Sequence, residues 1–423
     1  MATRRSILVI GGGAVGLCTA YYLNGAGCDV TVIDQGEIGS GSSLHNAGLV
    51  VPSHFIPLAA PGMVRMGLKW MFNPVSPFYI KPRLDVDLVR WLWLFAASCT
   101  AQHVGRTRAL LRDMSHASLA LYRELAHVPG MAFGFRRNGL AMLFRTEHGK
   151  RGAIAMAAQA KEIGVEARVL SRGELQELEP SVRFRASGAV YYPNDAHMNP
   201  ALFLDQLRET LIGRGVRILT STPALRFEQR LNGIQAVETP RGLLEADEFV
   251  LAGGAWSPEI LRPLRLFLPL QAGKGYSLTV RHPSVLPRIP MLLEEARVAV
   301  TPLGDRLRFA GTMEIAGLSP SITRRRVEAL ANAVPSYLEG IPPAEITAGD
   351  VWAGLRPLSP DGIPFIGRFR RFENLIAATG HAMLGISLAP ITGKLVAEIV
   401  EGRIPSIDLH LMRPERFQSA QQS

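Results

Sequence analysis

The sequence predicts a mixed α/β fold, in which a Rossmann-like dinucleotide-binding domain is assembled from separated segments and a second domain with an antiparallel sheet is inserted between them. Three observations predict this fold. A glycine-rich turn joins an apolar strand to a helix at the start of the chain, and similar strand–turn–helix patterns return at 248–257 and 375–400. Residues 268–316 alternate between apolar and polar side chains, with turn residues between them, as antiparallel strands do.

The first unit is a strand over residues 7–10 that ends in the glycine pattern of Gly11, Gly13 and Gly16. Gly11 allows a sharp turn, Gly13 lets the backbone approach a pyrophosphate, and Gly16 lets the following helix, residues 14–23, pack closely on the sheet. The first N–H groups of that helix would point at the phosphates. This pattern predicts a dinucleotide site.

The next apolar run supports this interpretation. Residues 30–33 predict a second strand that ends on Asp34, where a carboxylate accepts hydrogen bonds from ribose hydroxyls. The same carboxylate would repel the additional phosphate of an NADP-type ligand. Asp34 suits NAD and FAD equally, so the choice between them stays open at this point.

The remaining elements follow in order. A loop of small polar residues over 39–48 can surround a ligand that makes many hydrogen bonds, and residues 84–125 predict long amphipathic helices. Further strands are expected at 49–50, 139–144, 188–193, 216–219, 248–251 and 375–379, and further helices at 199–214 and 386–400.

Composition narrows the class of protein. The 423 residues, 47% of them hydrophobic, are enough for two or three domains with a full core. The formal net charge of +10 comes from scattered residues, with one dense run at 324–326, so no nucleic acid is expected as a partner. A positive field would concentrate anionic substrates such as carboxylates. Three cysteines without CxxC spacing predict no metal site and a reducing, cytoplasmic compartment.

A membrane-spanning helix is not expected. The apolar segment 88–97 is half the length that crosses a bilayer and contains Arg90. Its tryptophans, Trp91 and Trp93, together with the positive charge of the chain, would suit peripheral contact with the inner face of a membrane that holds the electron acceptor. Whether electrons pass to oxygen or to a quinone is left open.

A set of motifs spread over nearly the whole chain resembles a known family. These motifs are residues 11–16 with Asp34, 46–50, Pro52, 60–62, 68–72, 273–277, 352–362, 379–381, 384–385 and 392–393. With them the chain resembles the D-amino-acid oxidase superfamily of FAD-dependent oxidoreductases, and within it the D-amino-acid dehydrogenases. The resemblance implies FAD as cofactor and oxidation of the C–N bond of an amino acid by hydride transfer to flavin N5, which gives an imine that hydrolyses.

The resemblance also divides the chain and places residues at the cofactor. An FAD-binding domain is expected at 1–85, 193–262 and 350–412, a substrate-binding domain at 86–192 and 263–349, and a flexible tail at 413–423. The expected cofactor-binding residues are Gly11, Gly13, Ala14, Val15, Gly16, Asp34, Gln35, Gly41, Ser42, Ser43, His45, Asn46, Ala47, Gly48, Leu49, Ala224, Ala252, Gly253, Gly254, Trp256, Gly380, His381, Met383, Leu384, Gly385 and Ile386.

Two residues at the cofactor carry further expectations. His45 takes a place similar to the histidine that is covalently attached to flavin in dimethylglycine and sarcosine dehydrogenases, but D-amino-acid dehydrogenases lack it, so noncovalent FAD is the preferred prediction. The turn 380–385 would aim backbone N–H groups and a helix N-terminus at the negative charge of the reduced flavin. His381 is expected beside the isoalloxazine, with no acid or base role.

Four residues are the candidates for work on the substrate. Arg356 matches the superfamily arginine that grips the substrate carboxylate through two parallel hydrogen bonds. Tyr276 either points its hydroxyl at the same carboxylate or closes the pocket, with Lys274 nearby, and His54 either lines the substrate cavity or stabilises its loop. No general base is named, because the lone pair of a neutral amine can drive hydride departure directly.

Alternatives remain open. The motif at 193–200 departs from typical D-amino-acid dehydrogenases and resembles relatives that oxidise secondary amines, such as D-proline or hydroxyproline, sarcosine, iminodiacetate and other N-substituted glycines. The other two alternatives are an NAD-dependent dehydrogenase and a flavoprotein subunit without turnover.

Overall fold

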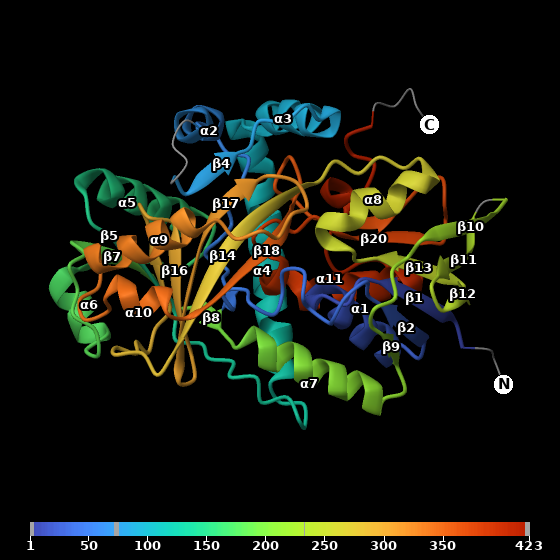
Figure 1. Cartoon of the computed structure of the whole chain (residues 1–423), viewed down its shortest axis with the longest axis horizontal. Coiled ribbons are helices and arrows are strands. Elements are labelled where there is room, and N and C mark those ends of the chain that lie inside the picture. The colour runs from blue at the N-terminus through green and yellow to red at the C-terminus, as the bar shows by residue number, and fades with distance from the viewer. Residues whose placement is uncertain (1–3, 72–75, 232, 419–423) are drawn as a thin grey trace.

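The structure is a computed structural model that describes residues 4–71, 76–231 and 233–418 (Figure 1). Two large sheets lie side by side, one built around the first strand of the chain and the other around the long strands after residue 270. Phe72, the end of the 68–72 motif, and residues 419–423 of the predicted tail lie outside the described residues.

The first sheet has six strands and contains the three predicted strand–turn–helix units. Its spatial order is β19 (Phe365–Arg368), β20 (Leu375–Thr379), β13 (Glu248–Leu251), β1 (Ser6–Ile10), β2 (Asp29–Ile33) and β9 (Arg217–Leu219). β19 runs antiparallel to β20 and all other neighbours are parallel. The parallel arrangement is the one expected of a dinucleotide-binding sheet, and each predicted strand of this sheet is confirmed.

Both faces of this sheet are buried. Val9 packs with α1 (Ala14–Gly25), α4 (Ala101–Leu125), α7 (Pro200–Gly213) and α11 (Gly385–Val400) in one apolar core. Leu8 points to the opposite face and packs with Phe249 and Leu264 in another core. The predicted helix at 199–214 is confirmed as α7, whose first turn is capped by the Asn199 side chain. Burial on both faces explains why these strands are continuous apolar runs.

The second sheet has nine strands. Its order is β18 (Asp350–Leu358), β14 (Gln271–Arg281), β17 (Arg306–Ile315), β16 (Val298–Leu303), β15 (Met291–Leu293), β5 (Leu140–Phe144), β7 (Gly188–Tyr192) and β6 (Arg168–Ser171), and β4 (Phe78–Ile80) pairs with β17. The antiparallel strands predicted within 268–316 are confirmed as β14 to β17. The pairs β15–β5 and β17–β4 are parallel, so the sheet as a whole is mixed.

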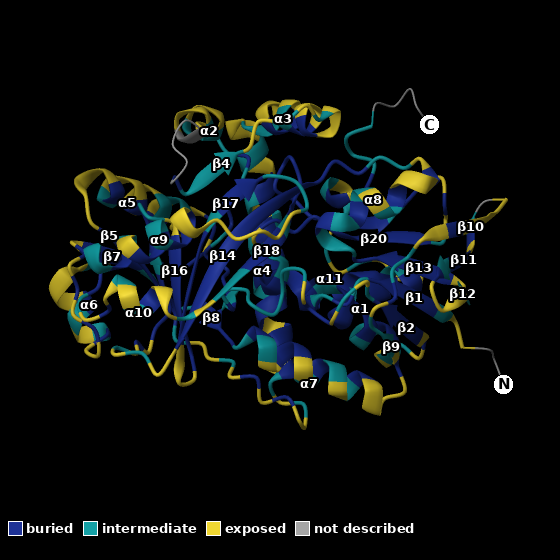
Figure 2. Cartoon of the chain, in the orientation of Figure 1, coloured by how far each residue is buried: buried dark blue, intermediate teal, exposed yellow. Residues whose placement is uncertain are grey.

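The other elements surround these two sheets. They are the helices α2 (Met63–Met71), α3 (Val86–Ser98), α5 (Glu147–Glu162), α6 (Arg172–Leu178), α8 (Ser257–Leu261), α9 (Arg324–Ala333) and α10 (Pro343–Thr347), the 3-10 turns η1 (Gly254–Trp256), η2 (Arg262–Leu264), η3 (Val334–Ser336) and η4 (His410–Met412), and the strands β3 (Leu49–Val50), β8 (Ala196–His197), β10 (Arg226–Arg230), β11 (Gly233–Thr239) and β12 (Gly242–Glu245). Both sheets are buried, whereas α2, α3 and α6 present exposed faces (Figure 2).

The two sheets meet at the end of β18. The N–H of Ala382, in the turn after β20, donates to the Pro357 carbonyl at 2.9 Å. The N–H of Leu355 donates to the Gly41 carbonyl, in the loop after β2, at 3.1 Å. One strand of the larger sheet is therefore bonded to two loops at the carboxyl edge of the smaller sheet, where ligands bind in folds of this kind.

The predicted division into domains stays a prediction, and three facts bear on it. β18 begins at residue 350 and β4 precedes residue 85, yet both belong to the nine-stranded sheet. Arg416, inside the predicted tail 413–423, donates to both oxygens of Asp361 at 2.7 and 2.8 Å. This pairing attaches the described part of the tail to the rest of the molecule.

Candidate active site

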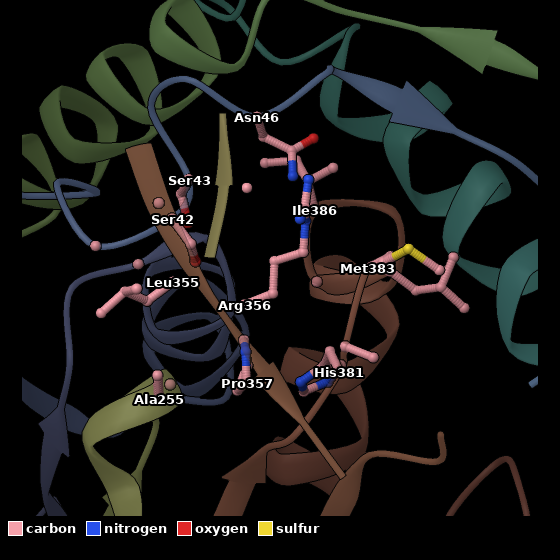
Figure 3. Close-up of a pocket in the computed structure, with 18 of the residues that line it drawn as sticks. Ser42, Ser43, Asn46, Ala255, Leu355, Arg356, Pro357, His381, Met383 and Ile386 are labelled. Atoms are coloured by element: carbon pink, nitrogen blue, oxygen red, sulfur yellow. The ribbon is translucent and has the colours of Figure 1, made fainter. Parts of the chain in front are cut away.

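A single cavity of about 840 Å³ runs along the junction between the two sheets. Its wall is formed by the turn after β1, the loop over 39–49, the turn after β20 and the adjoining face of the nine-stranded sheet. Figure 3 shows Ser42, Ser43 and Asn46 on one side and His381, Met383 and Ile386 on the other, with Arg356 rising from β18 between them.

The glycine turn after β1 brings three backbone segments into close contact. Gly11 has a φ of +115°, and a Cβ there would lie 2.4 Å from the Ala252 carbonyl oxygen. A Cβ at Gly16 would lie 1.8 Å from the Gly11 carbonyl oxygen. Both positions therefore require glycine, Gly11 for the turn and Gly16 for the packing of α1 on the strand.

Asp34 stands at one end of the cavity. Its two carboxylate oxygens accept hydrogen bonds from the backbone N–H groups of Gly12 at 2.7 Å and Gly36 at 2.9 Å. Burial raises the pKa of Asp34, and these two hydrogen bonds oppose the rise. A carboxylate has about four acceptor positions, so Asp34 retains capacity for ribose hydroxyls. Thr222 and Pro223, which the sequence did not indicate, line this end beside Ala224.

The N-terminus of α1 opens toward the cavity. Gly13, at its N-cap, provides no side-chain hydrogen bond, and Ala14 N–H donates instead to Ser43 Oγ at 3.1 Å. The first N–H groups of a helix have no partner within the helix. Together with the side chains of Ser42 and Ser43, which line the cavity, these N–H groups suit a phosphate.

The other end of the cavity is formed by the turn after β20. α11 begins at Gly385 without a side-chain cap, and Gly385, Ile386 and Ser387 line the cavity. His381 is buried, and its Nε2 lies 2.8 Å from Thr392 Oγ1. Burial lowers the pKa of His381 to about 3, so its ring is neutral. A helix N-terminus here can stabilise negative charge on a ligand.

His45 faces the cavity against an aromatic partner. Its ring lies 5.1 Å from the ring of Trp352, with an angle of 31° between the planes. The carbonyls of its neighbours, Leu44 and Asn46, accept hydrogen bonds from Arg308 Nη1 at 3.4 and 2.7 Å. Burial, followed by the positive charge of Arg308, lowers the pKa of His45. The larger sheet thus holds this loop in place.

Arg356 is the cation at the centre of the cavity. Its Nη1 donates to the Thr312 carbonyl at 2.8 Å, and no carboxylate of the described residues lies within 4 Å of the guanidinium. Burial lowers the pKa of Arg356 to about 10, so it still carries its charge at neutral pH. A Cβ at Gly275 would lie 2.1 Å from Arg356 Nη1, so only glycine leaves room for the guanidinium.

Tyr276 and Lys274 lie on β14 with different surroundings. Tyr276 lines the cavity, but its hydroxyl donates to Glu314 Oε2 at 3.0 Å. Lys274 does not line the cavity: its Nζ donates to the Ser321 carbonyl at 2.9 Å and lies 3.6 Å from Glu314. Arg326 is a second cation 3.6 Å from the same glutamate. Lys274 is thus part of a buried ion cluster beneath the site.

Comparisons with known proteins agree with this geometry. The family model for FAD-dependent oxidoreductases (DAO) matches residues 6–399. A curated relative from Granulibacter bethesdensis, D-amino acid dehydrogenase, is 34% identical over 408 residues, which cover 95% of this chain and 97% of the relative. The chain belongs to the DAO family of FAD-dependent oxidoreductases.

Two solved structures share the fold of this DAO family member. Glycine oxidase from Geobacillus kaustophilus has a TM-score of 0.78 at 22% identity and covers 98% of this chain and 99% of its own. Iminodiacetate oxidase from Chelativorans sp. BNC1 has a TM-score of 0.68 at 22% identity, with 96% and 98% covered. The alternative of an NAD-dependent dehydrogenase is wrong, because the matching family is FAD dependent.

FAD fits the residues that are present. The cavity extends from the Asp34 carboxylate past the N-terminus of α1 to the N-terminus of α11. This arrangement suits a ligand with ribose hydroxyls, phosphates and a ring that becomes negatively charged. When bound, FAD accepts a hydride, and the protein contributes binding, orientation and electrostatics. In the described ranges, no cluster of three metal-binding side chains occurs.

Most residues predicted for the site lie together in this cavity. The predicted residues that do not line it are Gly16, Gly48, Gly380 and Lys274. The three glycines shape the turns behind its wall, where a Cβ at Gly48 would lie 2.2 Å from the Met198 carbonyl oxygen. Residues that the sequence did not indicate include Met63, Met66, Met142, Met156, Ser53, Ser277, Arg297 and Thr312. Ser53 and Arg297 lie in turns and the others on strands or helices, and the wall that they share forms only in the folded protein.

Proposed function

We propose that this DAO family member oxidises the C–N bond of a small amino or imino acid. When bound, FAD would accept a hydride from the carbon next to nitrogen, and the imine product would hydrolyse in water. The observation that carries this proposal is Arg356, a partly buried cation in the FAD cavity whose only hydrogen-bond acceptor among the described residues is the Thr312 carbonyl. A guanidinium in such a place favours an anion, and a carboxylate matches its geometry.

In this proposal, different residues of the chain bind the substrate, stabilise charge and shape the cavity. Arg356 fixes the position and the rotation of the carboxylate. Thr312 holds Nη1, which leaves the other N–H groups of the guanidinium for the substrate. The N-terminus of α11 stabilises negative charge on the reduced flavin. Tyr276 forms part of the wall, and its bond to Glu314 supports a role in shape instead of a direct bond to the carboxylate.

The substrate class follows from two sources. The relative from Granulibacter bethesdensis is named a D-amino acid dehydrogenase and covers nearly the whole chain, which supports a D-amino acid. The motif at 193–200 supports the alternative, a secondary amine such as D-proline, hydroxyproline, sarcosine, iminodiacetate or another N-substituted glycine. Both classes carry a carboxylate next to the reacting carbon, so Arg356 serves either.

A substrate panel tests the proposal. The purified flavoprotein is mixed under anaerobic conditions with D-amino acids, D-proline derivatives and N-substituted glycines, and the loss of flavin absorbance is followed. We expect rapid bleaching by members of one class, and the order of the rates separates D-amino acids from secondary amines. If no member bleaches the flavin, the protein is a flavoprotein without this activity.

We propose that FAD is bound without a covalent bond at His45. The His45 ring already packs on Trp352, and Arg308 holds both neighbouring carbonyls. These contacts support a role in shaping the wall beside the ring system. The electron acceptor, oxygen or a quinone, belongs to the same proposal.

A membrane contact would bring a quinone within reach. In the described ranges, no helix combines the length and the apolar character that crossing a bilayer needs. α2 and α3 lie next to each other on one side of the molecule, and their exposed apolar residues include Leu68, Val86, Val89 and Trp93 (Figures 1 and 2). Arg65 and Lys69 are exposed on α2, and Met63 and Met66 of α2 line the cavity. Apolar and basic side chains together suit an anionic membrane surface.

Vesicle flotation tests this contact. We expect the holoenzyme to float with vesicles that contain phosphatidylglycerol and much less with pure phosphatidylcholine. Trp93→Ser should reduce the bound fraction several-fold, whereas Ile404→Ser, which also changes an exposed apolar residue but lies outside α2 and α3, should not. Equal binding by the two variants would place the contact elsewhere. If the unaltered protein does not float, it makes no such membrane contact.

A further inference from the structure

A buried carboxylate, Asp195, lies next to two residues of the cavity wall. Asp195, in the turn between β7 and β8, is 1% exposed. Its Oδ1 accepts a hydrogen bond from Ser53 N–H at 3.1 Å, and its Oδ2 accepts one from Ser53 Oγ. No cationic side chain of the described residues lies within 4 Å of it. A buried acid held by one serine differs from the ion pairs found elsewhere in the chain.

The serine connects Asp195 to a histidine that faces the cavity. Ser53 Oγ lies 3.1 Å from His54 Nδ1, and both residues line the cavity. The other ring nitrogen, His54 Nε2, has no hydrogen-bond partner in the described part of the chain and is not fully enclosed. It is therefore open to a ligand in the cavity.

The donor and acceptor capacities of Asp195, Ser53 and His54 determine where the protons lie. An ionised carboxylate can only accept, so the single hydroxyl proton of Ser53 goes to Asp195. Ser53 Oγ then accepts from His54, which places a proton on Nδ1. A neutral imidazole with its proton on Nδ1 presents Nε2 as an acceptor. A substrate ammonium group, which can only donate, matches this state of His54.

The backbone places His54 near the flavin end of the cavity. Val51 N–H donates to Ser387 Oγ, in the first turn of α11, at 3.1 Å. His54 N–H donates to the Val51 carbonyl at 3.0 Å, which closes a tight turn. The two ends of such a turn are less than about 7 Å apart. His54 therefore lies close to the N-terminus of α11, the end of the cavity where the flavin ring would bind.

We propose that His54, Ser53 and Asp195 form a proton relay that removes one proton from the substrate's ammonium group. The inference rests on the proposed function. His54 Nε2 takes the proton from nitrogen, His54 passes its Nδ1 proton to Ser53 Oγ, and Ser53 passes its hydroxyl proton to Asp195. Three N–H or O–H bonds form and three break. An ammonium and a carboxylate become a neutral amine and a carboxylic acid, and the amine lone pair can then drive hydride departure.

The protonation preferences agree with this direction of transfer. Burial raises the pKa of Asp195 to about 7, against the two hydrogen bonds from Ser53. Burial, followed by Arg297, lowers the pKa of His54 to about 4, so His54 passes a proton on and does not keep it. The other groups around the relay are Tyr191 and Tyr192, whose pKa values are raised, and Glu294, which acts on Tyr192. Both tyrosines stay neutral at working pH.

The pH dependence of flavin reduction tests the relay. Stopped-flow traces are recorded anaerobically from pH 5.5 to 10 with D-alanine, or with D-proline if D-alanine does not reduce the flavin. For the unaltered enzyme we expect an acid limb near pH 7, where the rate of flavin reduction rises as the pH increases. In Asp195→Asn the limb should move up by more than one pH unit, toward the pKa of the free amine, and the rate at pH 7 should fall about 10²-fold.

Two serine variants and one control sharpen the test. Ser53→Ala interrupts the relay and should shift the acid limb of the rate profile as Asp195→Asn does. Ser53→Thr keeps a hydroxyl, so its acid limb should stay near pH 7. Asp205→Asn, the same change on the exposed face of α7, should leave the profile unchanged. If Asp195→Asn and Ser53→Ala keep the limb near pH 7, the relay is wrong although the enzyme oxidises amines. If no amine reduces the flavin of the unaltered protein, the proposed function itself fails.

Discussion

Arg308 and Arg356, two arginines of the nine-stranded sheet, show how the surroundings of a residue decide its role. Burial lowers the pKa of Arg308 and of Arg356 to about 10, and neither has a carboxylate within 4 Å among the described residues. Arg308 donates to three oxygens, those of Leu44, Asn46 and Thr279, so the protein uses most of its donors. Arg356 donates to Thr312 alone. Only Arg356 retains the capacity for a bidentate bond to a ligand.

Removal of this guanidinium should separate catalysis from cofactor binding. Arg356→Ala should keep the flavin spectrum, because Arg356 is not part of the turns that hold FAD. Its kcat/KM for carboxylated amines should fall at least about 10²-fold, the usual effect of losing one partner of a buried charged pair. Steady-state kinetics measure this, with the exposed Arg226→Ala as control. Unchanged kinetics in Arg356→Ala would place the anchor elsewhere.

The sequence predicted which residues lie in the site better than it predicted where their side chains point. The Gly-Leu-Arg-Pro motif identified Arg356, and the 273–277 motif contains Tyr276. The direction of the Tyr276 hydroxyl depends on Glu314, a residue 38 positions away. Lys274 shares a strand with Tyr276, yet its ammonium group lies with Glu314 and Ser321. Such directions are set by contacts between distant segments, which no local pattern contains.

At the scale of elements, an irregularity in the sheet makes the anchor. The pairing of β14 with β17 shifts register between Lys274 and Tyr276. On β17, Thr312 has a φ of +62°, which is rare for a β-branched residue and is a sign of strain. The bulge turns the Thr312 carbonyl toward Arg356, across the space that Gly275 leaves open. Bulges of this kind often direct side chains beside active sites.

Gly275→Ala tests this geometry without altering a charged group. The new Cβ would meet the far end of the flexible Arg356 side chain, so the guanidinium should move while the fold and the FAD spectrum stay. We expect KM for carboxylated amines to rise at least about tenfold, because a displacement of 1 Å in an anchored substrate is costly. Gly105→Ala, on α4 with nothing near its Cβ, is the matched control. A KM equal to that of the control would mean that the added Cβ does not displace the Arg356 guanidinium.

Across the whole molecule, the sequence predicted the elements whose structure is determined by residues close together in the chain. The glycine turns, the parallel strands and the helices that follow them were confirmed because each is set by residues close in sequence. The nine-stranded sheet was only partly predicted, since the partners of β14 to β17 include β4, β5 and β18, which lie far away in the chain. The sequence identified His54 as a candidate, but not its connection through Ser53 to Asp195, because Ser53 and Asp195 lie 142 residues apart in the chain.

We propose that this DAO family member uses Arg356 to hold an anionic amine against FAD. The most direct measurement is anaerobic flavin bleaching by the best amino or imino acid of the panel, compared with the same amine lacking its carboxylate. We predict rapid bleaching by the carboxylated amine and a rate lower by about 10²-fold or more for its decarboxylated counterpart. Equal rates for the two amines, or no bleaching by either, would show that Arg356 does not hold a substrate carboxylate.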